Sequence, residues 1–149
     1  MHPVVQPPTL GILYSCTAIA SGSLLEGRVR TIDGKLDLAL AKPHELGGSG
    51  HAPGNDPFQL LAAAYSSSFL AALLAARSHD RPQLPPDAAV QATVKFGLRE
   101  DGGFGVEITL GVKLPGIEKA DAATWMEKAR HICSLCDATR HEVLRFELV

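Results

Sequence analysis

From Leu60 to Ala76 the chain carries no charged residue and consists only of Leu, Ala, Ser, Tyr and Phe. The residues just before this stretch are typical of a helix start, with Asp56 as N-cap, Pro57 in the first turn and Gln59 completing a capping box. The helix that follows is apolar or small on every face, whereas a surface helix carries polar residues on one side. We therefore expect a helix that is buried all round, at the centre of the fold.

A membrane span is the competing interpretation of this apolar stretch. A span needs ~20 predominantly apolar residues, and Ser66, Ser67 and Ser68 interrupt this one in its middle. The whole chain has 149 residues, of which 46% are hydrophobic and 20% charged, and this composition is that of an ordinary globular protein. Because one compact domain typically has this length, we expect residues 1–149 to form a single domain around a central helix.

Alternating apolar and polar residues predict strands on both sides of the helix. Before it we expect strands over 10–21, 27–32 and 36–40, with a two-residue turn at Asp33-Gly34 joining the last two. After it the clearest hairpin runs from Val90 to Val112, followed by an amphipathic helix that ends near Cys133 and a closing strand over 143–148. The predicted class is α+β, with the element order β-β-β-α-β-β-α-β.

The burial expected for the central helix also bears on the quaternary state. Two small sheets and one amphipathic helix offer little cover to a helix that is apolar on every face. Two copies of the chain would supply the missing cover if their central helices packed between the subunits. Small side chains allow such a close approach, and the helix has several: Ala62, Ala63, Ala64, Ala71 and Ala72. We therefore expect an obligate homodimer.

Charge and cysteine content exclude several classes of protein. The formal net charge is -2, and the Lys and Arg residues are scattered, so the basic footprint of a nucleic-acid-binding protein is missing. Three cysteines are too few for the disulfide scaffold of a secreted domain, and the first residues do not read as a secretory signal. We expect a cytoplasmic protein that binds neither nucleic acid nor a membrane.

Cys133 and Cys136 form the motif C-S-L-C, which leaves three interpretations open. The two residues could be a redox dithiol, a pair of zinc ligands with His131 and His141, or two small core residues. Redox thiols of this motif normally sit at a helix N-terminus, whereas Cys133 falls at the predicted C-terminal end of its helix, where the dipole opposes a thiolate. Most structural zinc sites have a second, distant ligand pair, so we expect no metal site and favour core residues.

The run of three serines in the central helix could include a nucleophile. No G-x-S-x-G elbow surrounds Ser66, Ser67 or Ser68. Serines inside a buried helix usually donate their hydroxyl to a carbonyl one turn earlier, and we expect that arrangement here.

Three segments of the chain follow one another in a distinctive order and spacing: LDLALAKPHELGGSG, NDPFQLLAAAYSSSFLAAL and HICSLCDATR. They resemble the organic hydroperoxide resistance (Ohr) branch of the OsmC/Ohr superfamily, and the resemblance spans nearly the whole chain. Members of that family are small α+β proteins that form intertwined homodimers, with two long central helices between sheets and an active site between the subunits. The resemblance implies the same fold and assembly here.

The resemblance also assigns the positions of the family's chemistry. In the family a peroxidatic cysteine on the central helix attacks the peroxide, a second cysteine resolves the sulfenic acid as a disulfide, and an Arg–Glu pair activates the first thiolate. By motif, the peroxidatic position falls on Ser68 and the resolving position on Cys133. The glutamate position falls on Phe58, and the loop that should hold the arginine contains Leu24 and Leu25.

Three of these four positions are altered, and Cys136 stands where the family pattern usually has serine. A serine hydroxyl is neither ionised at neutral pH nor suited to attack on an O–O bond, so the resemblance implies that the ordinary thiol-peroxidase reaction is lost here. We expect a homodimer that binds an apolar, lipid-like or hydroperoxide ligand at its interface, without a cofactor. The expected pocket is lined by Phe58, Tyr65, Leu24 and Leu25, close to the Ser68 and Cys133 positions.

Two alternatives to a binding protein stay open. Cys133 and Cys136 could form a relocated redox pair that reduces hydroperoxides and is regenerated by a dithiol reductant. The chain could also be a scaffold whose partner is another protein. The enzyme interpretation requires a reactive thiolate at neutral pH, and the binding interpretation does not.

Overall fold

The computed structural model describes residues 9–22, 27–77, 83–138 and 146–148. An antiparallel sheet of β1 (Ala18–Ser21), β2 (Arg28–Thr31) and β3 (Asp37–Ala39) precedes the 3-10 helix η1 (His44–Leu46) and the long helix α1 (Pro57–Ala75). The antiparallel hairpin of β4 (Ala89–Leu98) and β5 (Phe104–Lys113) follows, and then α2 (Lys119–Ile132) and α3 (Ser134–Ala138). The α+β class and the order of elements as far as α2 are as predicted.

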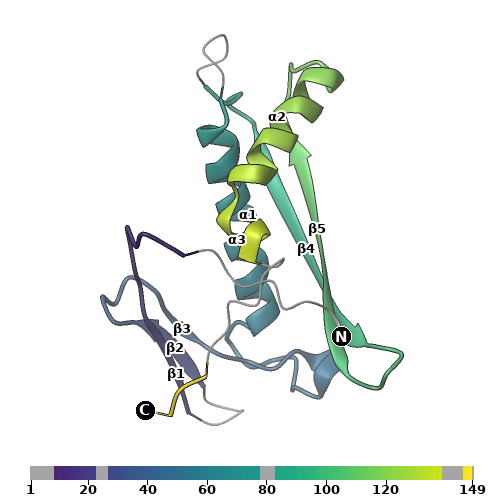
Figure 1. Ribbon diagram of the computed structural model, residues 1–149. Coiled ribbons are helices and arrows are strands. Elements are labelled where there is room, and N and C mark those ends of the chain that lie inside the picture. Colours follow the sequence, from purple (N-terminus) through teal and green to yellow (C-terminus); the bar gives the residue numbers. More distant parts are fainter. Residues whose placement is uncertain (1–8, 23–26, 78–82, 139–145, 149) are drawn as a thin grey trace.

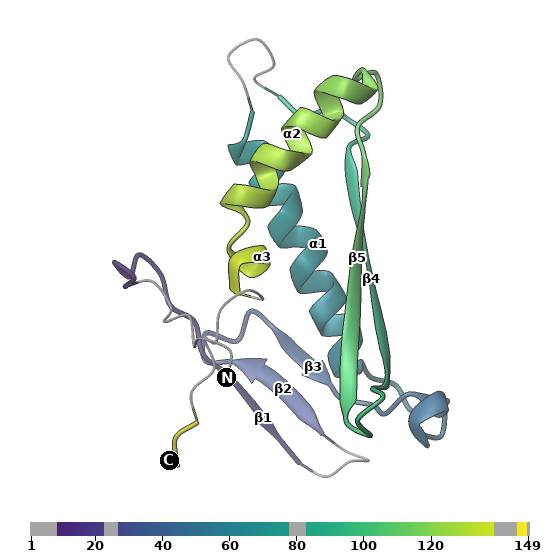
Figure 2. The ribbon, with the colours of Figure 1, turned by 45° about the vertical axis from the view of Figure 1, so that its right-hand side comes forward.

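Helix α1 runs through the middle of the molecule, with the β4–β5 hairpin along one side and α2 across another (Figures 1 and 2). Its start is the predicted capping box. The Asp56 carboxylate accepts the backbone N–H groups of Phe58 at 2.8 Å and Gln59 at 2.9 Å, and the Gln59 side chain accepts the N–H of Asp56 at 3.1 Å. These bonds fix the residue at which α1 begins, and therefore the face of the helix on which each later side chain lies.

The expectation that α1 is buried all round is wrong for a single chain. Its uncovered face is apolar and includes Leu70, which is 37% exposed, and Leu74, which is 46% exposed. The reason is geometric, because one hairpin and one helix can cover only one side of a helical cylinder. The buried side chains all lie on the covered side: Tyr65, Phe69, Ala72 and Leu73.

By length and composition α1 could also cross a membrane, since its apolar window has a mean hydropathy of 1.6 and only 22% of that window is buried. The core helix of a soluble protein passes the same test. In this chain one side of α1 packs against β4 and α2. What needs an explanation is that the other side of α1 is both apolar and exposed.

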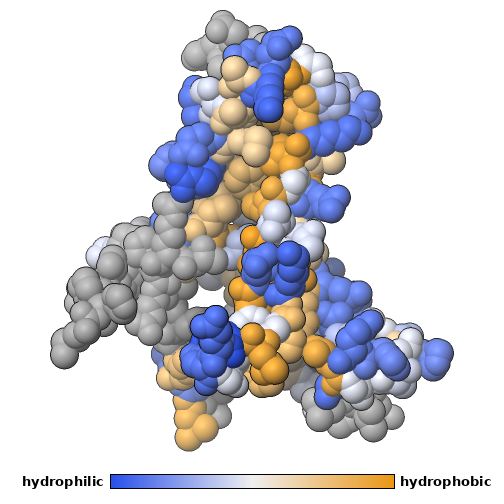
Figure 3. All heavy atoms as spheres, turned by 90° about the vertical axis from the view of Figure 1, so that its right-hand side faces the viewer, coloured by the Kyte–Doolittle hydropathy of each residue, from blue (hydrophilic) through white to orange (hydrophobic). Residues whose placement is uncertain are grey.

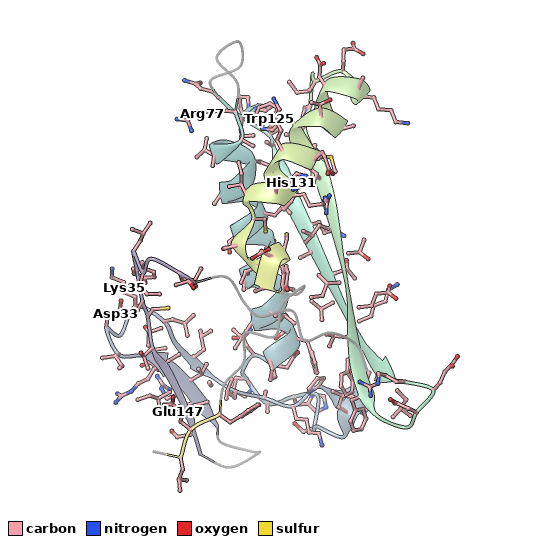
Figure 4. The ribbon with its side chains drawn as sticks, viewed as in Figure 1. Asp33, Lys35, Arg77, Trp125, His131 and Glu147 are labelled. Atoms are coloured by element: carbon pink, nitrogen blue, oxygen red, sulfur yellow. The ribbon has the colours of Figure 1, made fainter. Side chains whose placement is uncertain are left out.

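The core of the molecule lies between α1 and α2. Trp125, which is 7% exposed, donates its indole N–H to the carbonyl of Leu73 at 2.8 Å. Figure 4 shows Trp125 on α2 beside the end of α1. Since the last carbonyls of a helix have no partner within it, the indole satisfies one of them. Ala129 and Cys133 extend this core toward α3.

The first strand is shorter than predicted. The sequence pattern indicates a strand over 10–21, but β1 begins at Ala18 and pairs with β2 from Ala18↔Thr31 to Ser21↔Arg28. Because β2 ends at Thr31, the pairing stops there: the Thr17 carbonyl still accepts the Ile32 N–H at 3.0 Å, and within the described residues no strand pairs with the segment before it. Leu13 and Tyr14 are 101% and 79% exposed there.

The turn between β2 and β3 is wider than the predicted two residues. The Thr31 N–H donates to the Leu36 carbonyl at 2.9 Å, so the loop extends from Ile32 to Lys35. The Asp33 carboxylate holds this wider loop, because it accepts the Thr31 hydroxyl at 2.6 Å and the Lys35 N–H at 3.1 Å.

The second half of the chain follows the prediction more closely. Strands β4 and β5 pair without interruption from Ala89↔Lys113 to Leu98↔Phe104. Helix α2 ends at Ile132 with Cys133 as its C-cap, but α3 was not expected. The predicted closing strand over 143–148 lies mostly outside the described residues, and its described part, 146–148, is not in a strand.

Candidate functional site

The serines of α1 differ in their contacts. Ser66 and Ser67 donate their hydroxyls to the Ala63 carbonyl at 3.1 and 2.7 Å, as predicted for serines within a helix. Ser68 is half-buried, and its Oγ lies 3.9 Å from the Sγ of Cys133 in a hydrogen-bond contact. The structure thus brings together the two positions that the family pattern assigns to the peroxidatic and the resolving cysteine.

Cys133 is 2% exposed and lies at the junction of two helices. Its backbone N–H donates to the Ala129 carbonyl at 2.9 Å and so closes α2. Its sulfur accepts the backbone N–H of Cys136 at 3.4 Å, from the first turn of α3. The sequence does not predict this donor, because it gives no sign of a second helix directly after α2.

The two residues of the C-S-L-C motif lie in different environments. Cys133 belongs to the core, as expected, but Cys136 is only partly buried and lines a cavity. None of Cys16, Cys133 and Cys136 is in a disulfide. In the described part of the chain no group of three His, Cys, Asp or Glu side chains is placed to hold a metal ion. His141, the more distant zinc-ligand candidate, lies outside that part.

This cavity has a volume of about 720 Å³ and lies between α1, β5, α2 and α3. Its polar lining residues are Glu127 and Arg130, from the second half of α2, and Cys136, from α3, and we call this part of the wall its polar end. The rest of its wall is largely apolar and comes from three elements: Tyr65 and Phe69 of α1, Val106, Ile108 and Leu110 of β5, and Met126 of α2.

The polar end of the cavity holds a bidentate ion pair. Arg130 donates from Nε to Oε2 of Glu127 at 3.0 Å and from Nη2 to Oε1 at 2.6 Å. His131 Nε2 lies 3.1 Å from the same Oε1, and Figure 4 shows this histidine on α2. Hydrogen bonds from Arg130 lower the pKa of Glu127 to about 2, so its carboxylate is ionised at neutral pH. Glu127 and Arg130 together therefore carry no net charge.

The residues expected to line one ligand pocket are not together in this chain. Tyr65 lines the 720 Å³ cavity, whereas Phe58 lines two others, of about 440 and 330 Å³, beside Pro43 and Leu46. The Phe58 ring lies 4.8 Å from that of Phe96, measured between ring centroids. Leu24 and Leu25 lie outside the described residues.

The family of OsmC-like proteins matches residues 48–147, a range that contains α1, the β4–β5 hairpin and both Ser68 and Cys133. The chain belongs to the OsmC/Ohr family. Among its relatives is the organic hydroperoxide resistance protein of Xanthomonas axonopodis pv. citri. The two are 37% identical over 132 residues, which cover 89% of this chain and 91% of the relative.

Solved structures agree with this OsmC/Ohr assignment. An organic hydroperoxide resistance protein from Elizabethkingia anophelis, crystallised with thiocyanate bound, matches with a TM-score of 0.79 and 34% identity, over 88% of this chain and 91% of that one. A putative organic hydroperoxide resistance protein from Vibrio cholerae, with captopril in one of its active sites, matches with a TM-score of 0.78 and 32% identity, over 89% of each chain. The resemblance to the Ohr branch and the α+β fold are confirmed.

Proposed function

We propose that this OsmC/Ohr protein binds an apolar organic hydroperoxide or a lipid-like molecule and lacks the family's two-cysteine peroxidase reaction. The observation that carries the proposal is the contact of 3.9 Å between Ser68 Oγ and Cys133 Sγ. The residues at the peroxidatic and resolving positions are in contact, but the residue at the peroxidatic position carries a hydroxyl in place of a thiol. A thiol can be activated to a nucleophilic thiolate near neutral pH, whereas a serine hydroxyl stays protonated there.

The proposal includes a homodimer, for which the uncovered surfaces of the single chain give the reason. The face of α1 that carries Leu70 and Leu74 is apolar, and the single chain leaves these residues 37% and 46% exposed. The N-terminal part also exposes large apolar side chains, with Ile12 at 71%, Leu13 at 101% and Ile32 at 72%. Large apolar patches on a soluble protein mark contact surfaces. A second copy that places its own α1 against this face would cover it.

We also place the protein in the cytoplasm, where cysteine thiols stay reduced. The described thiols, including the exposed Cys16, form no disulfide. Exposed cysteines suit a reducing compartment better than an oxidising one.

A second candidate function is hydroperoxide reduction by the other cysteine pair. It is favoured by one observation, since Cys136 lines the large cavity and donates its backbone N–H to the sulfur of Cys133. In this reaction the Cys136 thiolate would take one oxygen of the hydroperoxide, releasing the alcohol, and the resulting sulfenic acid would condense with Cys133 to a disulfide and water. A dithiol would then have to reduce the disulfide.

Steady-state consumption of cumene hydroperoxide in the presence of a dithiol tests the proposed function. We expect the native protein to consume the peroxide at a rate close to that of a protein-free control, because Ser68 cannot form the sulfenic acid. Sustained turnover that is lost on Cys136→Ser would contradict the proposal and support the second candidate.

Replacing Ser68 by cysteine should restore little of the family's activity. The new thiol would be half-buried, which raises a thiol pKa, and the positions of the activating pair hold Phe58 and Leu24 or Leu25. We expect kcat/KM to stay about 10²–10⁴-fold below that of a relative with the intact pair. Ser67→Cys, at the exposed neighbouring position, is the matched control. A fully active Ser68→Cys protein would show that the pair is not needed.

A further inference from the structure

We infer that the ligand of this protein binds in the 720 Å³ cavity between α1, β5, α2 and α3, with an uncharged polar head group against the Arg130–Glu127 pair. This inference rests on the proposed function, because it locates the apolar ligand and defines its chemical class. The class is a molecule with an apolar chain and a single uncharged hydroxyl or hydroperoxide group.

The size and lining of the cavity fit such a molecule. Ligand sites in proteins have volumes of about 300–1,000 Å³ and apolar walls with a few convergent polar groups. The cavity has the apolar wall already described, contributed by α1, β5 and α2, and one polar end. Figure 3 shows that apolar residues form a band down the face of the molecule that carries the β4–β5 hairpin. An apolar chain therefore has one preferred orientation, with its head toward Arg130.

The charge at the polar end selects the head group. Both carboxylate oxygens of Glu127 are bonded to the Arg130 guanidinium. An anionic head would have to compete with Glu127 for Arg130 and would lie beside a like charge. A hydroxyl or hydroperoxide can donate to the carboxylate or accept from the guanidinium, and it brings no charge into the cavity. The pair thus favours an alcohol or hydroperoxide over a fatty acid of the same length.

The Ser68–Cys133 contact offers less room for a ligand. Cys133 is 2% exposed and Ser68 is half-buried, and neither lines this cavity. The cavity also lies on the covered side of α1, with Tyr65 and Phe69, whereas the apolar side with Leu70 points away from it. A dimer through the uncovered side would leave the cavity in place.

Calorimetric titration with 1-octanol and octanoate at pH 7.4 tests the selectivity, because the two probes share a chain length and differ in head charge. We expect the native protein to bind octanol about tenfold more tightly than octanoate. In Glu127→Gln the guanidinium loses its charged partner, and octanoate should gain about tenfold while octanol changes little.

Glu107→Gln is the matched control for this experiment. Glu107 pairs with Lys95 at 3.0 Å and alternates along β5 with Val106 and Ile108, so it lies on the strand face opposite the cavity. Its replacement should leave the preference for octanol unchanged. Retained octanol binding by Glu127→Gln would show that the variant is folded.

Alkylation of the cysteines by iodoacetamide tests the location. Bound octanol should slow the modification of Cys136, which lines the cavity, and leave that of the exposed Cys16 unchanged. Octanoate binding as tight as octanol, an unchanged preference in Glu127→Gln, or no protection of Cys136 would overturn the inference. Binding of cumyl alcohol without protection of Cys136 would reject this cavity but keep the proposed function. No binding of either alcohol would reject both.

Discussion

Replacing Trp125 by alanine should lower the free energy of unfolding by about 3–5 kcal/mol, the usual cost of removing a buried aromatic side chain. Trp125 is 7% exposed, packs in the core between α1 and α2, and donates to the Leu73 carbonyl. Its loss would leave both a cavity and a helix carbonyl without its donor. Urea unfolding followed by far-UV circular dichroism, at fixed protein concentration, measures the change.

Two further variants separate the causes of that loss. Trp125→Phe keeps most of the apolar volume and removes the donor, so about 1–3 kcal/mol should be lost. Thr124→Ala changes the exposed neighbour on α2, whose hydroxyl donates to the Ala120 carbonyl, and should change stability by less than about 0.5 kcal/mol. If Trp125→Ala were as stable as the native protein, the core would not lie where the structure places it.

The second large effect concerns the proposed homodimer. Glutamates in place of Leu70 and Leu74 would put two charges on the uncovered apolar face of α1. If two copies meet through this face, the charges would have to be buried without partners. The dissociation constant should then rise by a factor on the order of 100 or more. Sedimentation velocity at low micromolar concentration should show a dimer for the native chain and a monomer for the variant.

Thr124→Glu is the control for this experiment, because it adds a charge to an exposed position on α2 that is outside the proposed interface. It should sediment as the native dimer. A native chain that is monomeric at low micromolar concentration would remove the homodimer, and the exposed face of α1 would then need another explanation.

Local patterns were sufficient to predict several elements. The capping box at Asp56 and Gln59 and the hairpin from Val90 to Val112 form as predicted. Both depend on residues close in sequence, either through side-chain bonds to adjacent backbone groups or through alternation along two neighbouring strands. The end of α2 near Cys133 was predicted for the same reason.

Features that depend on distant residues were predicted less well. The predicted strand over 10–21 begins only at Ala18, because its partner β2 ends at Thr31. The turn at Asp33 is wider than predicted, because the Asp33 carboxylate bonds to Thr31 and Lys35. The hydropathy of α1 indicates that its faces pack against other elements. It does not indicate which of these faces the same chain covers.

The candidate site was predicted in part. The family pattern assigns the peroxidatic and resolving positions to Ser68 and Cys133, and the structure places these two residues in contact. The ion pair of Glu127 and Arg130 was not predicted, although opposite charges three residues apart on a helix are a signal for one. Their position in the wall of an apolar cavity follows from the arrangement of α1, β5, α2 and α3 around it, which spacing along α2 does not encode.

The proposal that Cys133 and Cys136 carry out no dithiol chemistry can be tested most directly by the intact mass of the native protein after one equivalent of cumene hydroperoxide. We predict that the mass stays unchanged and that no stoichiometric cumyl alcohol forms. A loss of about two mass units, mapped to a disulfide between Cys133 and Cys136, would contradict this and show that the protein reduces hydroperoxides with a relocated cysteine pair.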